Sequence, residues 1–310
     1  MARYYIGPAG WSYEDWEGIV YPAPRPRGFH PLSYLPRFVD IVEVNSTFYR
    51  PAPPALVESW LRRIAGRPDF LLALKLHQAF THAREGFSDR DVDDVRRAAD
   101  LVRLRGRLAA LLVQFPWSFR NTPENIEYLR RLLGLFEGYP LAVEVRHAGW
   151  DAPAFYDLLR GRGAAFCNID QPLFDDSIAP GAVSTTPDFA YVRLHGRNYR
   201  NWFREGAGRD DRYDYLYARN ELEDWVARIR QLGAKSGKVY VVTNNHYRGQ
   251  AMANALQIRN MITGQKVDVP EPMLEKYPVL REIVRAIRTG QKDLFSDESE
   301  SGTGNEGGSI

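Results

Sequence analysis

The chain has 310 residues, of which 44% are hydrophobic and 26% charged, and its formal net charge is +2. This is the composition of a globular protein. So small a net charge argues against a protein that coats nucleic acid or binds a membrane surface, and any cationic site must therefore be local. The sequence has a single cysteine, Cys167, which excludes an internal disulfide and fits a reducing compartment. It shows no signal-peptide pattern and no apolar run of about 20 residues, so we expect a cytoplasmic protein with no membrane contact.

Short apolar runs alternate with helical patterns along the chain, which is typical of a parallel sheet built from βαβ units. In chain order, we expect strands at Tyr4–Gly7, Ile41–Asn45, Leu71–Leu76, Ala109–Phe115, Leu141–Arg146, Ala164–Asp170, Phe189–His195 and Val239–Asn244. Each run is nearly continuous in apolar residues, as in strands whose two faces are both covered. The pattern predicts an α/β protein with a TIM-type (β/α)₈ barrel, forming a single domain over residues 1–295.

The connections between these strands are predicted to be helical, with one exception. Thr122 followed by Pro123 is typical of a helix start, and a further helix is expected from about Gly249 to Met261. The segment 171–188 contains three prolines and no helical pattern, so we expect an irregular crossover after the sixth strand. Residues 296–310 are rich in Ser, Gly and Glu and are expected to form a disordered tail.

Polar residues stand at the carboxyl ends of the expected strands, which is the face of a barrel that carries active sites. Five pairs are spaced i, i+2, namely Glu43/Asn45, Lys75/His77, Glu144/Arg146, Asn168/Asp170 and Arg193/His195. Side chains alternate along a strand, so the two members of a pair share a face. Charges under packed helices would be costly, so we expect these pairs to face the barrel mouth, with ion pairs that only stitch the rim as the alternative.

The predicted mouth holds more cations than carboxylates. The candidate ligand-binding residues are Trp11, Asn45, Tyr49, Lys75, Arg146, Arg193, Arg197, Asn244, Asn245 and Arg248. Guanidinium groups grip carboxylate or phosphate with two hydrogen bonds, and backbone N–H groups at a helix start after the last strand would suit a phosphate. Trp11 and Tyr49 would wall the pocket.

The leading interpretation is an enzyme acting on a small anionic ligand, phosphorylated or carboxylated. Glu144 or Glu43 would be the general acid or base, because neighbouring cations and burial tune a carboxyl group. His195 would be the second proton-transfer group, since histidine titrates near neutral pH, and Asp170 is a further catalytic candidate.

Several of these strand-end motifs resemble a known family. They are Gly10–Tyr13 with Trp16, Gly18, Tyr21 and Pro22, Glu43–Tyr49, Thr81-His82, Gln114–Pro116, Glu144–His147 with Trp150, Asp170 with Pro172, Arg193–Arg197 and Asn244-Asn245. Ordered over roughly residues 5–260, they resemble the YecE-like proteins that contain domain of unknown function 72. The resemblance implies a TIM-type barrel similar to the xylose-isomerase-like group, which also holds endonuclease IV, and no established activity.

Two alternatives stay open. The first is a metal-dependent phosphodiesterase or isomerase of the endonuclease IV-like kind that binds DNA, although nearby Arg and Lys would oppose a divalent cation, so we assign no metal ligand. The second is a non-catalytic module that senses a ligand or docks a partner. The requirement for a cofactor and the oligomeric state are unknown from the sequence, and nucleic acid is the less favoured partner.

Overall fold

The computed structural model describes residues 2–202, 204, 206 and 208–285, and within them eight strands form one parallel sheet. The strands are β1 (Arg3–Pro8), β2 (Ile41–Val44), β3 (Leu71–Lys75), β4 (Leu108–Gln114), β5 (Leu141–Glu144), β6 (Ala165–Asp170), β7 (Phe189–Leu194) and β8 (Lys238–Thr243). Their order is β1-β8-β7-β6-β5-β4-β3-β2, so consecutive strands from β2 to β8 are paired and β1 pairs with β8. Each predicted strand is present, with ends shifted by a residue or two.

The sheet curls until β1 and β2 meet. The Gly10 N–H donates to the Glu43 carbonyl oxygen at 2.8 Å, and the Asp40 N–H donates to the Ile6 carbonyl oxygen at 3.0 Å. Gly7 allows this approach, because a Cβ atom there would lie 1.8 Å from the carbonyl oxygen of Ile41. The predicted TIM-type barrel is therefore confirmed, with a seam where a glycine brings two backbones together.

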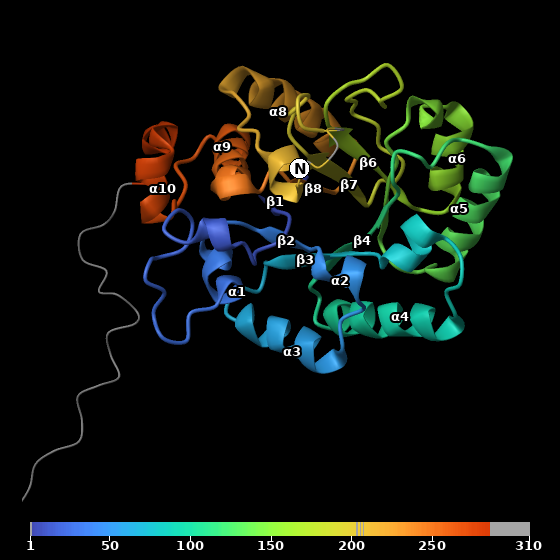
Figure 1. Cartoon of the computed structure of the whole chain (residues 1–310), viewed down its shortest axis with the longest axis horizontal. Coiled ribbons are helices and arrows are strands. Elements are labelled where there is room, and N and C mark those ends of the chain that lie inside the picture. The colour runs from blue at the N-terminus through green and yellow to red at the C-terminus, as the bar shows by residue number, and fades with distance from the viewer. Residues whose placement is uncertain (1, 203, 205, 207, 286–310) are drawn as a thin grey trace, which may run out of the picture.

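Helices surround the strands (Figure 1), with α3 and α4 along the lower edge of the view, α5 and α6 at the right and α8 and α9 on the opposite side of the barrel from α3. The helices are α1 (Pro31–Tyr34), α2 (Ser46–Tyr49), α3 (Pro54–Arg63), α4 (Asp89–Leu104), α5 (Pro123–Leu135), α6 (Pro153–Gly161), α7 (Arg209–Tyr213), α8 (Arg219–Gly233), α9 (Gln250–Thr263) and α10 (Glu271–Lys276). Short 3₁₀ segments cover Glu14–Trp16, Leu35–Arg37, Ala148–Trp150, Tyr247–Gly249 and Pro278–Glu282, and a π turn covers Ala79–Ala83. None of the helices in the described ranges is long and apolar enough to cross a membrane.

Local sequence signals explain where these helices begin. The Thr122 hydroxyl accepts a hydrogen bond from the Asn125 N–H at 3.3 Å, and Pro123 stands at the first helical position of α5, as predicted. The predicted helix after the last strand is α9, which begins at Gln250 after Gly249 in the left-handed conformation (φ +81°).

The crossover from β6 to β7 is irregular, as predicted, with no helix or strand assigned between residues 171 and 188. The Asn168 side chain holds the crossover by pairing with both backbone groups of Val183, at 2.8 and 2.9 Å. Thr185 adds hydrogen bonds to the Phe166 N–H at 2.8 Å and the Ala164 carbonyl oxygen at 2.7 Å. The predicted domain end at residue 295 and the predicted disordered tail, 296–310, lie outside the described residues.

Candidate active site

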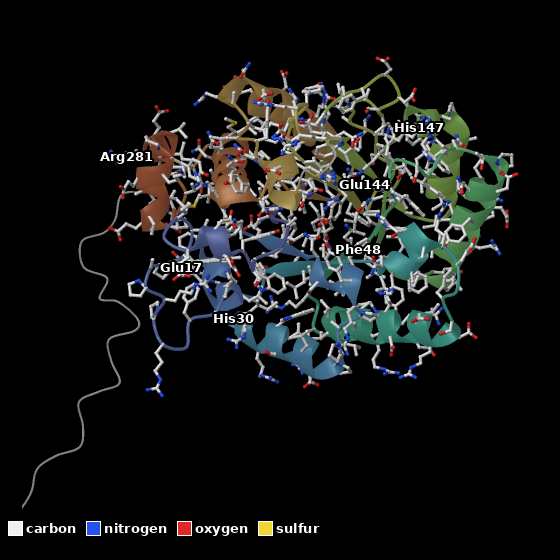
Figure 2. The ribbon with its side chains drawn as sticks, viewed as in Figure 1. Glu17, His30, Phe48, Glu144, His147 and Arg281 are labelled. Atoms are coloured by element: carbon white, nitrogen blue, oxygen red, sulfur yellow. The ribbon has the colours of Figure 1, made fainter. Side chains whose placement is uncertain are left out.

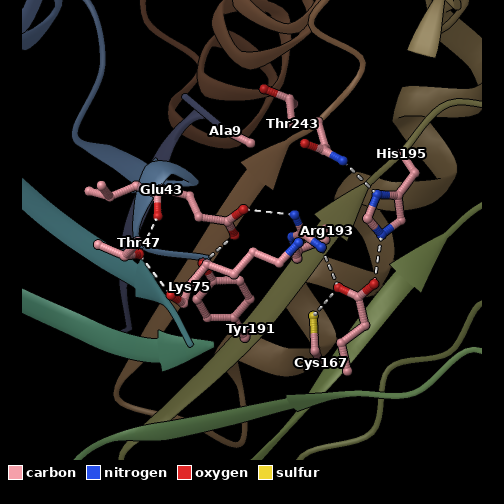
Figure 3. Close-up of polar contacts among 12 residues, drawn as sticks. Ala9, Glu43, Thr47, Lys75, Cys167, Tyr191, Arg193, His195 and Thr243 are labelled. Carbon is pink, nitrogen blue, oxygen red and sulfur yellow. Dashed lines mark hydrogen bonds and ion pairs between the residues drawn. The ribbon is translucent and has the colours of Figure 1, made fainter. Parts of the chain in front are cut away.

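A buried arginine links two glutamates across the inside of the barrel (Figure 3). Arg193, on β7, donates from Nη1 to Glu144 Oε2 at 2.5 Å and from Nη2 to Glu43 Oε1 at 2.7 Å. The second oxygen of Glu43 accepts from the hydroxyl of Tyr191 at 3.0 Å. All four side chains are buried, so this charge cluster is a fixed part of the barrel interior.

The second oxygen of Glu144 is also occupied. Oε1 lies 3.1 Å from His195 Nε2, 3.1 Å from Arg146 Nε and 3.0 Å from Arg146 Nη2. Burial raises the pKa of Glu144, but the charges of Arg193 and Arg146 and the hydrogen bond from His195 outweigh burial and hold that pKa well below its usual value. Glu144 is therefore an ionised carboxylate whose two oxygens are both already paired.

His195 bridges Glu144 and the end of β8. Asn244 Nδ2 lies 2.9 Å from His195 Nδ1, and the ring is fully buried. Burial lowers the pKa of His195 to about 3, against the opposing attraction of Glu144. We assign the neutral tautomer with its proton on Nε2, because Nδ1 then accepts from Asn244 and Nε2 donates to Glu144.

A cavity of about 510 Å³ lies over this cluster at the carboxyl ends of the strands. It is lined by Gly10, Trp11, Ser12, Tyr13, His30, Asn45, Ser46, Phe48, Tyr49, Leu56, Trp60, Lys75, Gln114, Arg146, Arg193, Tyr213, Asn244 and His246. Figure 2 shows Phe48 and Glu144 near the centre of the molecule, whereas Glu17, His30, His147 and Arg281 lie farther out. Lys75, Arg146 and Arg193 line the cavity and no described Asp or Glu does, so the wall is cationic.

Lys75 is the cation of this wall with no acidic partner. Its ammonium lies 4.1 Å from the centroid of the Phe48 ring, and no carboxylate of the described residues lies within ion-pairing distance. Burial lowers the pKa of Lys75, repulsion by Arg193 and Arg146 lowers it further, and the pKa falls to about 7 although Glu43 and Glu144 oppose the shift.

Aromatic rings form the rest of the wall. Tyr13 stacks on the ring of His246, with 4.5 Å between centroids and 9° between planes. Trp11 meets Trp60 edge to face at 5.8 Å, and Tyr49 is 64% exposed at the rim. Such walls suit ligands that bring apolar or flat surfaces as well as charge.

The predicted site residues fall into three groups. Those that line the cavity are Trp11, Asn45, Tyr49, Lys75, Arg146, Arg193 and Asn244. Those that lie beneath it and do not line it are Glu43, Glu144 and His195. Those that lie elsewhere are Asp170, Arg197, Asn245 and Arg248.

The orientation expected for Asn168 and Asp170 is wrong. Cys167 Sγ lies 4.0 Å from Glu144 Oε2, so Cys167 faces the inside of the barrel. Because side chains alternate along β6, Asn168 and Asp170 point outward toward the helices. Asp170 there accepts from the Tyr217 hydroxyl at 2.5 Å and from Arg197 Nε at 2.9 Å. The aromatic and cationic partners supplied by the connection after β7 make this outward burial tolerable.

Asn245 and Arg248 also lie away from the cavity. Asn245 Nδ2 donates to the Tyr215 carbonyl oxygen at 2.7 Å and to Asn254 Oδ1 at 2.8 Å, so it ties loops together. Arg248 has φ +50° and lines a separate surface hollow of about 420 Å³ beside Lys276. Its backbone N–H, just before the helix whose start we expected to suit a phosphate, donates to the Asp15 carboxylate.

Several cavity residues were not predicted. Phe48 follows Asn45 within the same strand-end motif, Tyr13 belongs to the Gly10–Tyr13 motif after the first expected strand, and His246 comes two residues after the last one, so their positions carried a signal. Trp60 comes from α3 and Tyr213 from α7, where an aromatic residue has the pattern of helix packing and gives no such signal.

The acidic side chains at the strand ends, which could serve as metal ligands, are committed to other partners. Glu43 and Glu144 bind Arg193, and Asp170 binds Arg197. Across the described ranges, no group of three or more His, Cys, Asp and Glu side chains is arranged to hold a metal ion. The residues present therefore do not fit the metal centre that an endonuclease IV-like enzyme would need.

Comparison with known proteins identifies relatives along most of the chain. A curated relative from Bacillus subtilis, "UPF0759 protein YunF", is 29% identical over 271 residues, covering 83% of this chain and 94% of the relative. A crystal structure of a DUF72 family protein from Thermotoga maritima has 33% identity and a TM-score of 0.73, covering 84% of this chain and 99% of that one. One from Enterococcus faecalis has 20% identity and a TM-score of 0.71, with coverage of 85% and 98%, and supports the fold alone.

The family model described as "Protein of unknown function DUF72" matches residues 5–276. That range takes in β2 to β8, most of β1 and every residue of the cavity wall. The chain belongs to the DUF72 family.

Proposed function

We propose that the cavity binds a small anionic ligand, phosphorylated or carboxylated, and that the protein is an enzyme acting on it. The observation that carries this proposal is the composition of the wall, where basic side chains stand without an acidic residue. The carboxylates beneath are already paired with Arg193 and Arg146, so a bound anion would meet the basic side chains of the wall rather than Glu43 or Glu144.

Lys75 and Arg146 are the proposed anion contacts. Arg146 uses Nε and Nη2 on Glu144, which fixes the guanidinium plane while leaving Nη1 for a ligand. A bound anion would stabilise the protonated form of Lys75, because its negative charge would oppose the effects of burial and of the cationic neighbours that disfavour the ammonium. Asn45 and Asn244 add amide groups that would orient the ligand.

The support for an enzyme, rather than a sensor, is the protonation behaviour of Lys75. A group with a pKa of about 7 inside a ligand cavity exchanges protons readily at neutral pH. Glu144 and His195 do not line the cavity, and all their polar atoms are paired, so the proton-transfer role expected for them passes to Lys75.

Titration with inorganic phosphate and with acetate, followed by calorimetry and thermal shift at low salt, tests the anion site. Both anions should raise the melting temperature. Lys75→Met and Arg146→Met should each weaken binding by about tenfold or more, since each removes a charge-assisted contact. Lys276→Met is the matched control, because Lys276 lies in the other hollow, and it should bind like the wild type.

Equal binding by Lys75→Met, Arg146→Met and the wild type would contradict the anion site. Catalysis is tested by screening phosphorylated and carboxylated metabolites for product formation. Ligands that stabilise the protein in this screen without yielding any product would favour the sensor alternative.

A further inference from the structure

The amino group of Lys75 is held in place from both ends of its side chain. Lys75 is the last residue of β3, and its carbonyl oxygen accepts a hydrogen bond from the Thr47 hydroxyl at 2.7 Å. The same hydroxyl lies 2.9 Å from the Val44 carbonyl oxygen, which is a second acceptor. At the other end the nitrogen lies over the Phe48 ring. Figure 3 shows the side chain entering the same interior as Glu43 and Arg193. The nitrogen is therefore positioned at the cavity wall rather than swinging in solvent.

The charges around this nitrogen favour loss of its proton. With His195 neutral, the cluster beneath the cavity contains two glutamates and two arginines that cancel. A proton on Lys75 is thus an excess charge in a buried environment, and its pKa falls to about 7. Near neutral pH a large share of Lys75 is a free amine, which is the nucleophilic form of lysine.

A second polar atom at the cavity wall also lacks a partner. Asn45 Oδ1 is buried, and no hydrogen-bond donor of the described residues reaches it. A buried acceptor without a donor is costly, and a donor brought by a ligand would relieve that cost. Gln114, at the end of the neighbouring strand β4, places an amide on the same wall.

We propose that Lys75 is a nucleophile that forms a Schiff base with an aldehyde or ketone ligand whose phosphate or carboxylate is held by Arg146. This inference rests on the proposed anion site and adds the chemical class of the ligand and the covalent step. The unpaired amine, the adjacent guanidinium and the open acceptor of Asn45 together carry it.

The step balances with water as the only other product. The Lys75 nitrogen attacks the carbonyl carbon, a C–N bond forms, and the C=O π electrons move to oxygen, which takes a proton from nitrogen to give a carbinolamine. The hydroxyl then takes up a proton from solvent and leaves as water while the nitrogen lone pair forms the C=N bond. The iminium N–H or the carbinolamine hydroxyl is the donor that Asn45 Oδ1 would accept from.

Borohydride trapping tests this step, because hydride reduces the C=N bond to a stable amine. The full chain would be treated with borohydride and glycolaldehyde phosphate, glyoxylate or neutral glycolaldehyde, and the modified lysines located by peptide mass spectrometry. The chain has six lysines, so each is readily followed. We expect Lys75 to react at least about tenfold faster than exposed Lys238 with the two anionic probes, and to show a smaller advantage with glycolaldehyde, which lacks the anion that Arg146 would hold.

Two variants separate the covalent step from anion binding. Lys75→Arg keeps a positive charge but has no amine for this reaction, so it should bind phosphate and lose trapping at position 75. Lys238→Arg should trap at Lys75 like the wild type.

Phosphate binding without borohydride labelling of Lys75, or labelling of Lys75 and Lys238 at equal rates, would overturn the Schiff base and leave the proposed function standing. Absence of phosphate and acetate binding, with no preference for the phosphorylated aldehyde, would overturn both.

Discussion

Arg193 shows how one side chain can be structural and still shape a ligand site. It satisfies Glu43 and Glu144 at once, at 2.7 and 2.5 Å, from a position that is 1% exposed. Removing one partner of a buried ion cluster is costly because the charges left behind have neither water nor counterion. The same pairing keeps both carboxylates off the cavity wall, which is why that wall is cationic.

Arg193→Met should therefore destabilise the protein by about 3–5 kcal/mol, since it leaves Glu43 buried without a cation and removes one of the two arginines that pair with Glu144. Urea unfolding followed by circular dichroism measures this loss. Arg130→Met is the control, because Arg130 pairs with Glu127 on the half-exposed surface of α5, and a loss of at most about 1 kcal/mol is expected. A similarly small loss for Arg193→Met would mean that the cluster does not hold the charges assigned to it.

At the scale of elements, strand periodicity predicted much of the site. Glu144 with Arg146, and Arg193 with His195, do share the inside of the barrel, because alternation along a strand fixes which residues lie on one face. Alternation does not fix which face that is, so Asn168 and Asp170 were placed inside although they point outward. Their partners Val183, Arg197 and Tyr217 come from segments whose path the sequence did not reveal.

Loops and helices account for the remaining differences. Trp60 reaches the cavity from α3, where an aromatic residue on a helix has the pattern of ordinary packing. Arg248 lies away from the cavity, because its backbone takes the left-handed conformation and its N–H donates to Asp15, a contact between residues 233 positions apart. Tertiary contacts of this range are not encoded in local periodicity, so these positions could not be predicted.

The barrel seam gives an element-scale prediction at Gly7. A Cβ atom there would lie 1.8 Å from the Ile41 carbonyl oxygen, and backbone cannot move aside as a flexible side chain can. Gly7→Ala should push β1 from β2 and cost about 3 kcal/mol in unfolding free energy. Gly161→Ala, at the end of α6 where a Cβ atom meets nothing within 4 Å, should change stability by less than about 1 kcal/mol. Equal stability of the two variants in urea unfolding would argue against a glycine-dependent seam.

At the scale of the whole molecule, the distribution of charge indicates a cationic ligand site that the net charge does not. The formal net charge of +2 gives no hint of a cationic cavity, because acidic residues balance the basic ones elsewhere in the chain. Inside the barrel the charges are paired except at Lys75. The fold tolerates an amine there at a cost in stability, which is the usual relation between a functional site and the structure that carries it.

That cost should be visible in the pH dependence of stability. Lys75 has a pKa of about 7 in the fold and an ordinary value of 10.5, so between these limits the unfolded chain binds more protons and the contribution of Lys75 to the unfolding free energy rises with pH. Below pH 7 both states are protonated, and the penalty for burying the charge is fully present.

Lys75→Met removes this penalty, so the variant should be more stable than the wild type by roughly 5 kcal/mol at pH 6, with the advantage shrinking as the pH approaches 10. Urea unfolding of the two proteins from pH 6 to 10 gives the difference directly, and the titration of all other groups cancels in it. Lys238→Met, at an exposed position, should track the wild type at every pH. If the difference in unfolding free energy between Lys75→Met and the wild type stays constant with pH, Lys75 keeps an ordinary pKa. The argument for a free amine at neutral pH would then fail, whereas the anion site formed with Arg146 does not depend on it.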